Sequence, residues 1–253
     1  MKILFLILVL PISFPFVFAD NEIFITFSED MNLVNFDGKW TFFHEWKEST
    51  LDTIEGGVIL RIAHYGDYIY ALIDNTVDRT MDLGLDRATI CFDSKNDKNF
   101  ILDKNDYCFT ATLGRESGLS YQGGYPYTSL SNLQKIPNVN GFIAIGGISD
   151  ENDRYDKNPH VSYEFKIPLN LLERSSKYGV YIEVFDANSY SFYTWPNGIK
   201  EHVRQIPSPA LWGEIISIDK SMPEFHNVVL IFSVLLFMTV LTKKFSVFVN
   251  KFN

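Results

Sequence analysis

The chain has 253 residues, of which 46% are hydrophobic, and a formal net charge of −9 at pH 7. The acidic balance comes without a cluster of lysine and arginine, which argues against a nucleic-acid partner, because neutralising phosphates needs grouped basic side chains. With the two apolar ends set aside, about 200 residues remain, a comfortable size for one domain with a real core.

The N-terminal end is typical of a secretion signal. Apolar or small residues run from the start of the chain to Ala19, and small side chains at the positions that a signal peptidase reads predict cleavage before Asp20. A buried N-terminal helix is the alternative, but Pro11 and Pro15 would interrupt it. We therefore expect residues 1–19 to be removed.

The first half of the exported region predicts short strands, because apolar and polar residues alternate there. A turn at residues 36–40 leads into an aromatic segment whose Trp40, Phe42, Phe43 and Trp46 are expected in the core or at its rim. The expected strands cover residues 23–27, 58–64, 68–74, 86–93 and 107–113, and the second and third form a hairpin around Tyr65-Gly66-Asp67.

The only two cysteines, Cys91 and Cys108, alternate with apolar residues in two of these expected strands. If the strands are antiparallel neighbours, both sulfurs can point to one side. A disulfide that closes a loop of about seventeen residues would stabilise the fold by roughly 3 kcal/mol, and export permits it. Two free, partly buried thiols are the alternative, and no third ligand is near enough in the sequence to make the pair a metal site.

The second half continues the same pattern after residues 114–131, which are expected to form a long surface loop. The clearest alternation is that of Val161 to Ile167, followed by a connection with one helical turn at 170–173 and a second run that Gly179 opens. Further strands are expected at residues 142–148 and 211–216. About nine strands with almost no helix predict an all-β fold, an antiparallel β-sandwich.

The C-terminal end is typical of a membrane anchor. Residues 228–242 are almost entirely apolar, and extension back to Phe225 gives roughly 27 Å of helix. A pair of lysines follows, which predicts a cytoplasmic tail at 243–253 and places residues 20–221 outside the cell. A buried core helix is the alternative.

The short segment before that helix, residues 222–227, contains Pro223-Glu224-Phe225. With the apolar helix and the basic pair behind it, this motif resembles the C-terminal sorting signals of archaeal surface proteins. The resemblance implies cleavage near the motif and transfer to a lipid anchor. His226 departs from the fuller motif, which often has glycine there, and without processing the helix is an ordinary membrane anchor.

A second resemblance extends over nearly the whole exported region. Seven fragments carry it in chain order: Asp37-Gly38-Lys39-Trp40, Tyr65 to Ala71, Asp86 to Asp93, Tyr163 to Pro168, Val184 to Ala187, Thr194-Trp195-Pro196 and Trp212-Gly213. Together they resemble the carbohydrate-binding modules of family 9 and the wider group of DOMON-like sandwiches. The resemblance implies a sandwich that binds sugar at one end, often with bound calcium, whereas some relatives bind haem instead.

A sugar site needs an exposed aromatic ring, on which the C–H face of a pyranose packs, and amide or carboxylate groups for its hydroxyls. Trp195 lies beside Tyr193 and follows Asp186 and Asn188, and these four residues are the predicted ligand-binding group. The alternative is that Trp195 closes the core under a loop.

Calcium prefers several carboxylate and carbonyl oxygens from flexible loops. Asp93, Asn96 and Asp97 offer one such metal-binding cluster, and the acidic residues of 150–156 offer another. Neither cluster has the spacing of a defined motif, so solvated surface loops are the alternative.

Haem would need axial ligands such as Met, His or Lys in an apolar pocket. Met81 with His160 or His202 could supply them, although no motif supports the pair. Catalytic motifs are missing from the sequence: His44 has no second histidine of a zinc-protease helix, and Ser117 does not stand in the middle of a Gly-x-Ser-x-Gly elbow. We therefore expect no enzyme.

The sequence as a whole predicts an exported, membrane-anchored β-sandwich on the cell surface. Its expected role is that of a non-catalytic binding module for carbohydrate. The alternatives are a haem-carrying electron-transfer domain and a structural surface protein that contacts other proteins.

Overall fold

The computed structural model describes residues 21–126, 132–199 and 205–219. The predicted signal at 1–19, the sorting motif at 222–227, the predicted helix at 228–242 and the tail behind it lie outside the described residues. No helix within the described residues is long and apolar enough to cross a bilayer.

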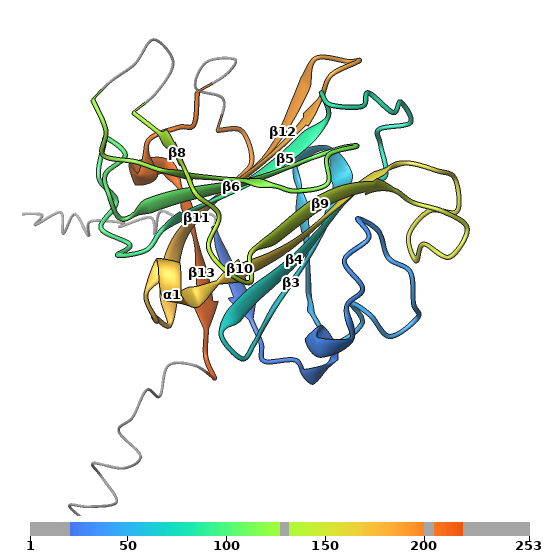
Figure 1. Ribbon diagram of the computed structural model, residues 1–253, viewed down its shortest axis with the longest axis horizontal. Helices are drawn as coiled ribbons and strands as arrows, with labels where there is room; N and C mark the ends of the chain where they lie inside the picture. The colour runs from blue at the N-terminus through green and yellow to red at the C-terminus, as the bar shows by residue number, and fades with distance from the viewer. Residues whose placement is uncertain (1–20, 127–131, 200–204, 220–253) are drawn as a thin grey trace, which may run out of the picture.

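Two β-sheets pack face to face around one core, which confirms the predicted β-sandwich (Figure 1). The larger sheet has the order β1 (Glu22–Ile25), β13 (Gly213–Ser217), β11 (Lys177–Asp186), β5 (Arg87–Asp93), β6 (Asp106–Thr112), β7 (Leu119–Gln122) and β8 (Gln134–Ile136), with β12 (Ser191–Trp195) also on β11. The smaller sheet has the order β2 (Thr50–Ile54), β3 (Val58–Tyr65), β4 (Tyr68–Asn75), β10 (Val161–Pro168) and β9 (Ile143–Ile148).

Helix is confined to single turns. The chain forms α1 (Leu169–Leu172) and the 3₁₀ turns η1 (Glu29–Leu33), η2 (Glu55–Gly57) and η3 (Pro209–Leu211) within the described residues. The predicted helical turn at 170–173 is therefore present as α1. It joins β10 to β11, and because these strands belong to different sheets, this short connection carries the chain across the sandwich.

Alternation decides which side chains enter the core. In β5, Ile90 and Phe92 point between the sheets, whereas Thr89 and Cys91 point to the outer face of the larger sheet. Each large apolar side chain buried in this way stabilises the fold by about 1.5–3 kcal/mol. The alternation with a period of two therefore places one set of side chains in the core and the other set on the outer face of the sheet.

The structure differs from the predicted strand count. It has thirteen strands within the described residues, and β2, β7, β8 and β12 were not expected. They are three to five residues long, and β7 lies inside the segment 114–131 that was expected to be a loop. Strands this short are held by pairing with a neighbour rather than by their own pattern. In addition, β1 pairs with β13 in parallel, so the sandwich is not purely antiparallel.

The N-terminal segment between β1 and β2 covers the outer face of the smaller sheet (Figure 1, blue). Its Trp40 and Trp46 are buried against Tyr70 and Leu72, as predicted. Phe42 and Phe43 were expected in the core or at its rim, but they are 58% and 66% exposed on the turn between the two tryptophans. The two tryptophans on either side of the turn point to the sheet, whereas the side chains of the turn itself face solvent.

A buried carboxylate holds this N-terminal segment against the smaller sheet. Glu164 of β10 accepts hydrogen bonds from the backbone N–H groups of Asp37 (2.9 Å) and Gly38 (2.8 Å) and from Trp46 Nε1 (3.0 Å). Asp37 to Trp40 and Tyr163 to Pro168 were two separate fragments of the predicted resemblance. The structure joins them through Glu164.

Candidate functional site

The outer face of the larger sheet holds a hollow of about 230 Å³. We call it the outer hollow. Its lining consists of Arg87, Thr89, Cys108, Thr110, Tyr121, Leu133, Glu183, Gln205 and Ile206. These residues come from β5, β6, β7, β11 and two loop segments, so the central strands of the sheet form the floor of the hollow.

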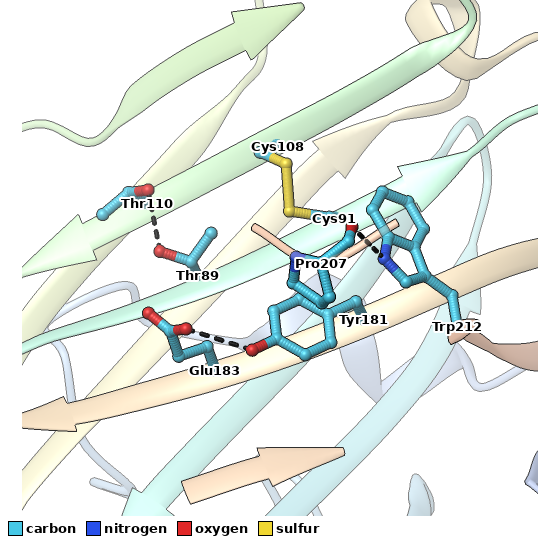
Figure 2. Close-up of a disulfide and its surroundings, with 8 residues drawn as sticks. All are labelled: Thr89, Cys91, Cys108, Thr110, Tyr181, Glu183, Pro207 and Trp212. Carbon is cyan, nitrogen blue, oxygen red and sulfur yellow. Dashed lines mark hydrogen bonds between the residues drawn. A yellow bond between two sulfur atoms is a disulfide. The ribbon is translucent and has the colours of Figure 1, made fainter. Parts of the chain in front are cut away.

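The disulfide predicted from the sequence lies beside this floor (Figure 2). Cys91 and Cys108 stand directly opposite each other on β5 and β6, and they are bonded across the strands. Two residues further along, Thr89 and Thr110 form the next outward pair, with their hydroxyl oxygens 2.9 Å apart. The covalent bond therefore fixes the register of the strands that present both hydroxyls.

An aromatic pair from β11 and the residue before β13 lies beside the disulfide (Figure 2). The ring of Tyr181 stacks on Trp212 with centroids 6.3 Å apart, and Trp212 Nε1 donates a hydrogen bond to the carbonyl oxygen of Pro207 (3.0 Å). The hydroxyl of Tyr181 in turn donates to Glu183 Oε2 (3.0 Å). These contacts hold the Glu183 carboxyl in one orientation.

The charges in the hollow are balanced. Burial raises the pKa of Glu183, whereas the hydrogen bond from Tyr181 and the nearby guanidinium of Arg87 oppose that shift. Arg87 is itself held 4.2 Å over the ring of Phe185. The hollow thus offers a cationic donor, an acidic group, two hydroxyls and the half-buried ring of Tyr121. This set suits a ligand with many hydroxyl groups and an apolar face.

The predicted ligand-binding group does not form a site. Trp195 is only 6% exposed, and its ring lies against Gly213, where a Cβ atom would come within 2.4 Å of it. It pairs with Ile182, and Tyr193 pairs with Val184, so the pleat turns both aromatic rings toward the core. The prediction of an exposed Trp195 platform was wrong, and the alternative, a core residue, is confirmed.

The other two members of that group lie apart from the hollow. Asp186 is buried in an acidic group at one end of the sandwich, and Asn188 is exposed on the turn that follows. The residues of the hollow were missed, although a signal was available. Thr89 and Thr110 stand two positions from the cysteines, so an outward disulfide places their hydroxyls outward as well.

The predicted metal cluster at Asp93, Asn96 and Asp97 is only partly brought together. Asp93 and Asn96 both lie against Gly179, but Asp97 is exposed. The carboxylate opposite Asp93 in the sheet is that of Asp106, which was not predicted.

Both Asp93 and Asp106 are buried, and each has one carboxylate oxygen without a hydrogen-bond partner, as does the side-chain oxygen of Asn96. Burial raises the pKa of Asp106 to about 8, and the charges of Asp93 and Asp103 add to the shift. A metal held by Asp93, Asn96 and Asp97 stays a prediction.

A second acidic group lies at the opposite end of β5, and we call it the end group. Carboxylate oxygens of Asp78, Asp86 and Asp186 lie within 4.8 Å of one another, and all three residues are buried. Asp82 lies next to them, since its backbone N–H donates to Asp86 Oδ2 (2.8 Å). No ion pair in the described part of the chain involves these carboxylates.

The end group fits the calcium that the resemblance implies. One oxygen each of Asp78 and Asp82 is buried without a hydrogen-bond partner, and so is the hydroxyl of Tyr163. Burial raises the pKa of Asp78 and Asp86, and the neighbouring carboxylates add to both shifts. Two of these unpaired oxygens come from the loop between β4 and β5 and one from β10, and oxygen atoms are the ligands that calcium prefers.

A third cluster, which contains Asp74, Asp153 and His160, has its own counter-charge. His160 Nε2 is hydrogen-bonded to Asp74 Oδ1, and its Nδ1 lies 2.8 Å from the carbonyl oxygen of Asn158 and 2.8 Å from Ser149 Oγ. Burial opposes the charge on the imidazole, but the bond and the charge of Asp74 outweigh it and raise the pKa of His160. We interpret this cluster as a buried ion pair that ties the loop before β10 to β4.

Comparison with known proteins adds little about function. No protein-family model matches the chain, and no curated protein matches it. Similar solved structures include a carbohydrate-binding module of family 9 from Caldicellulosiruptor kristjanssonii in complex with cellotriose. It is 12% identical, with a TM-score of 0.48 over 80% of this chain and 95% of that chain. A structure of such a module from the same organism in complex with glucose is 13% identical, with a TM-score of 0.47 over 80% and 97%. At these values the bound sugars say nothing about the ligand of this chain, so its ligand must be argued from its own residues.

Proposed function

We propose that this chain is an exported, membrane-anchored surface module that binds carbohydrate, without catalysis, in the outer hollow. The observation that carries the ligand class is the lining itself. Arg87, Thr89, Thr110 and Glu183 offer donors and acceptors for sugar hydroxyls, and the ring of Tyr121 is available for the C–H face of a pyranose.

Export is supported by the disulfide. A bond between Cys91 and Cys108 persists in oxidising compartments and is rare in a reducing cytosol. The apolar N-terminal run and the apolar segment before the C-terminal lysines agree with an exported domain that is anchored in the membrane. Labelling of the intact cell surface by a membrane-impermeant reagent would test this half of the proposal.

The ligand half is tested by a glycan panel with the purified full chain and two variants. Tyr121→Ala removes the ring, and Glu183→Gln keeps the shape of the side chain but removes its charge. We expect each to weaken binding by roughly fivefold or more. The control is Phe100→Ala, because Phe100 is 86% exposed and does not line the hollow.

Two outcomes would count against the hollow. Binding to no glycan by a folded protein would remove carbohydrate as the ligand class and leave a role in protein contacts. Binding that survives in both variants would place the sugar elsewhere on the molecule.

A haem-binding function finds less support. Both ring nitrogens of His160 are engaged, with Asp74 and with Asn158, so this residue would have to break the buried ion pair to reach an iron. His202 lies outside the described residues. A visible absorption band in the purified protein would revive the haem alternative.

A further inference from the structure

The end group and the outer hollow share two strands. Asp86 directly precedes β5, and Asp186 is the last residue of β11. The next pair in the register is Arg87 opposite Phe185, in which the guanidinium stands 4.2 Å over the ring. Arg87 also lines the hollow. The wall of the hollow therefore begins one residue from the buried carboxylates.

The backbone orients these carboxylates, and of the three only Asp78 keeps an oxygen without a hydrogen-bond partner. Asp78 Oδ1 accepts from the backbone N–H of Thr80 (2.9 Å), and Asp86 Oδ1 accepts from that of Ala187 (2.9 Å). The second oxygen of Asp78 remains without a partner. The loops thus hold the group in place, although like charges this close repel one another strongly in a buried setting.

An independent observation from the other sheet points to a ligand among these carboxylates. Tyr163 belongs to β10 of the smaller sheet, is fully buried, and interacts electrostatically with Asp78, Asp86 and Asp186. Its hydroxyl has no hydrogen-bond partner. All the atoms offered are oxygens, which is the ligand set of a hard cation such as calcium and not of a thiophilic metal.

We propose that a divalent cation of the calcium class, held by the end group, fixes Arg87 and Phe185 at the wall of the outer hollow and thereby sets the affinity of the hollow for its ligand. The part that concerns affinity rests on the proposed function. The cation cancels the repulsion between Asp86 and Asp186, and this keeps the ends of β5 and β11 together. Without it, the strand ends separate and the Arg87 side chain loses its fixed position.

The first test is thermal unfolding of the full chain in calcium and in a chelator. Asp78→Asn is the informative variant, because Asp78 lies outside the hollow and the change keeps the size of the side chain. Calcium is expected to raise the Tm of the wild type. Asp78→Asn is expected to unfold at a higher temperature than the wild type in the chelator, since one like charge is gone, and to lose most of the rise with calcium.

The control is Glu48→Gln, which removes a charge from an exposed turn outside every acidic cluster and should keep the full response to calcium. A wild-type Tm that ignores calcium would overturn the proposal. So would an Asp78→Asn variant that is less stable than the wild type by the same amount with and without calcium, because the carboxylate would then serve only its hydrogen bonds.

The second test separates the coupling from the identity of the ligand. Calcium is expected to slow hydrogen exchange in the peptides that contain Arg87 and Phe185 in the wild type and not in Asp78→Asn. Hydrogen exchange needs no sugar, so this test can be interpreted even if no glycan in the panel binds. Where a glycan binds, calcium should raise its affinity about fivefold or more. Equal affinity with and without calcium, in protein whose Tm responds to calcium, would overturn the coupling.

Discussion

The two outer faces of the sandwich differ in what covers them. The face of the smaller sheet is closed by the chain itself, which buries Trp40 and Trp46 on it. The face of the larger sheet is closed only in part, by Trp212 and the residues before it, and it retains a hollow with charged and hydroxyl side chains. A sandwich needs only its inner faces for a core, so the outer faces are free to diverge, and the open one is available to a ligand.

The faces are also secured differently. Buried ionisable groups fasten the covered face, through the hydrogen bonds of Glu164 and the pair of Asp74 with His160. The open face is secured by a covalent bond between Cys91 and Cys108. The covered face should therefore respond to charge and pH, and the open face to reducing agents.

The largest expected effect is on the covered face. Glu164→Ala would leave two buried donors without an acceptor, the backbone N–H of Gly38 and the Nε1 of Trp46, whereas the N–H of Asp37 keeps the carbonyl oxygen of Asn35. We expect a loss of about 3–5 kcal/mol in the free energy of unfolding, measured with urea. Glu164→Gln keeps one acceptor oxygen and should lose less. Equal losses in the two variants would contradict the role given to the hydrogen bonds.

The next effect concerns the open face. The double variant Cys91→Ala with Cys108→Ala should lose about 3 kcal/mol, because the unfolded chain is no longer constrained by the loop of 17 residues. A reducing agent should lower the stability of the wild type by a similar amount and leave the variant unchanged. A variant that still loses stability on reduction would show that the effect is not due to this bond.

The ion pair on the covered face predicts a pH dependence. A histidine whose pKa is raised on folding contributes stability that is full below its unfolded pKa of about 6.5 and is lost as the pH rises through the folded value. His160→Gln should therefore cost roughly 1 kcal/mol more at pH 6 than at pH 9. The measurement is urea unfolding of both proteins across that range. A difference that stays constant with pH would mean that His160 is neutral in the folded protein.

The smallest effect is expected at the exposed turn of the cover. Phe43→Ser should change the free energy of unfolding by less than about 0.5 kcal/mol, since Phe43 is 66% exposed. Trp46→Phe, three residues along and fully buried, is the matched contrast and should lose more than this. A large loss in Phe43→Ser would show that the contacts of its ring with Lys47 and Arg154 stabilise the fold more than its exposure suggests.

The sequence by itself determined the strands whose side chains alternate over several residues. Val161 to Ile167 and the hairpin around Gly66 are present as β10 and as β3 with β4, because a period of two with one buried face is a local property. It also determined the disulfide, since Cys91 and Cys108 stand at matching positions of two such strands.

Only the tertiary structure decided which face each aromatic ring joins. Trp195 follows turn-forming residues and was expected in the open, but pairing with Ile182 turns it into the core. The end group could not be predicted from the sequence either. Asp78, Asp86 and Asp186 come from segments up to 108 residues apart, and only the pairing of β5 with β11 brings them together. Alternation along one strand determines which side chains share a face. The pairing of that strand with its neighbours determines whether that face lies in the core or in solvent.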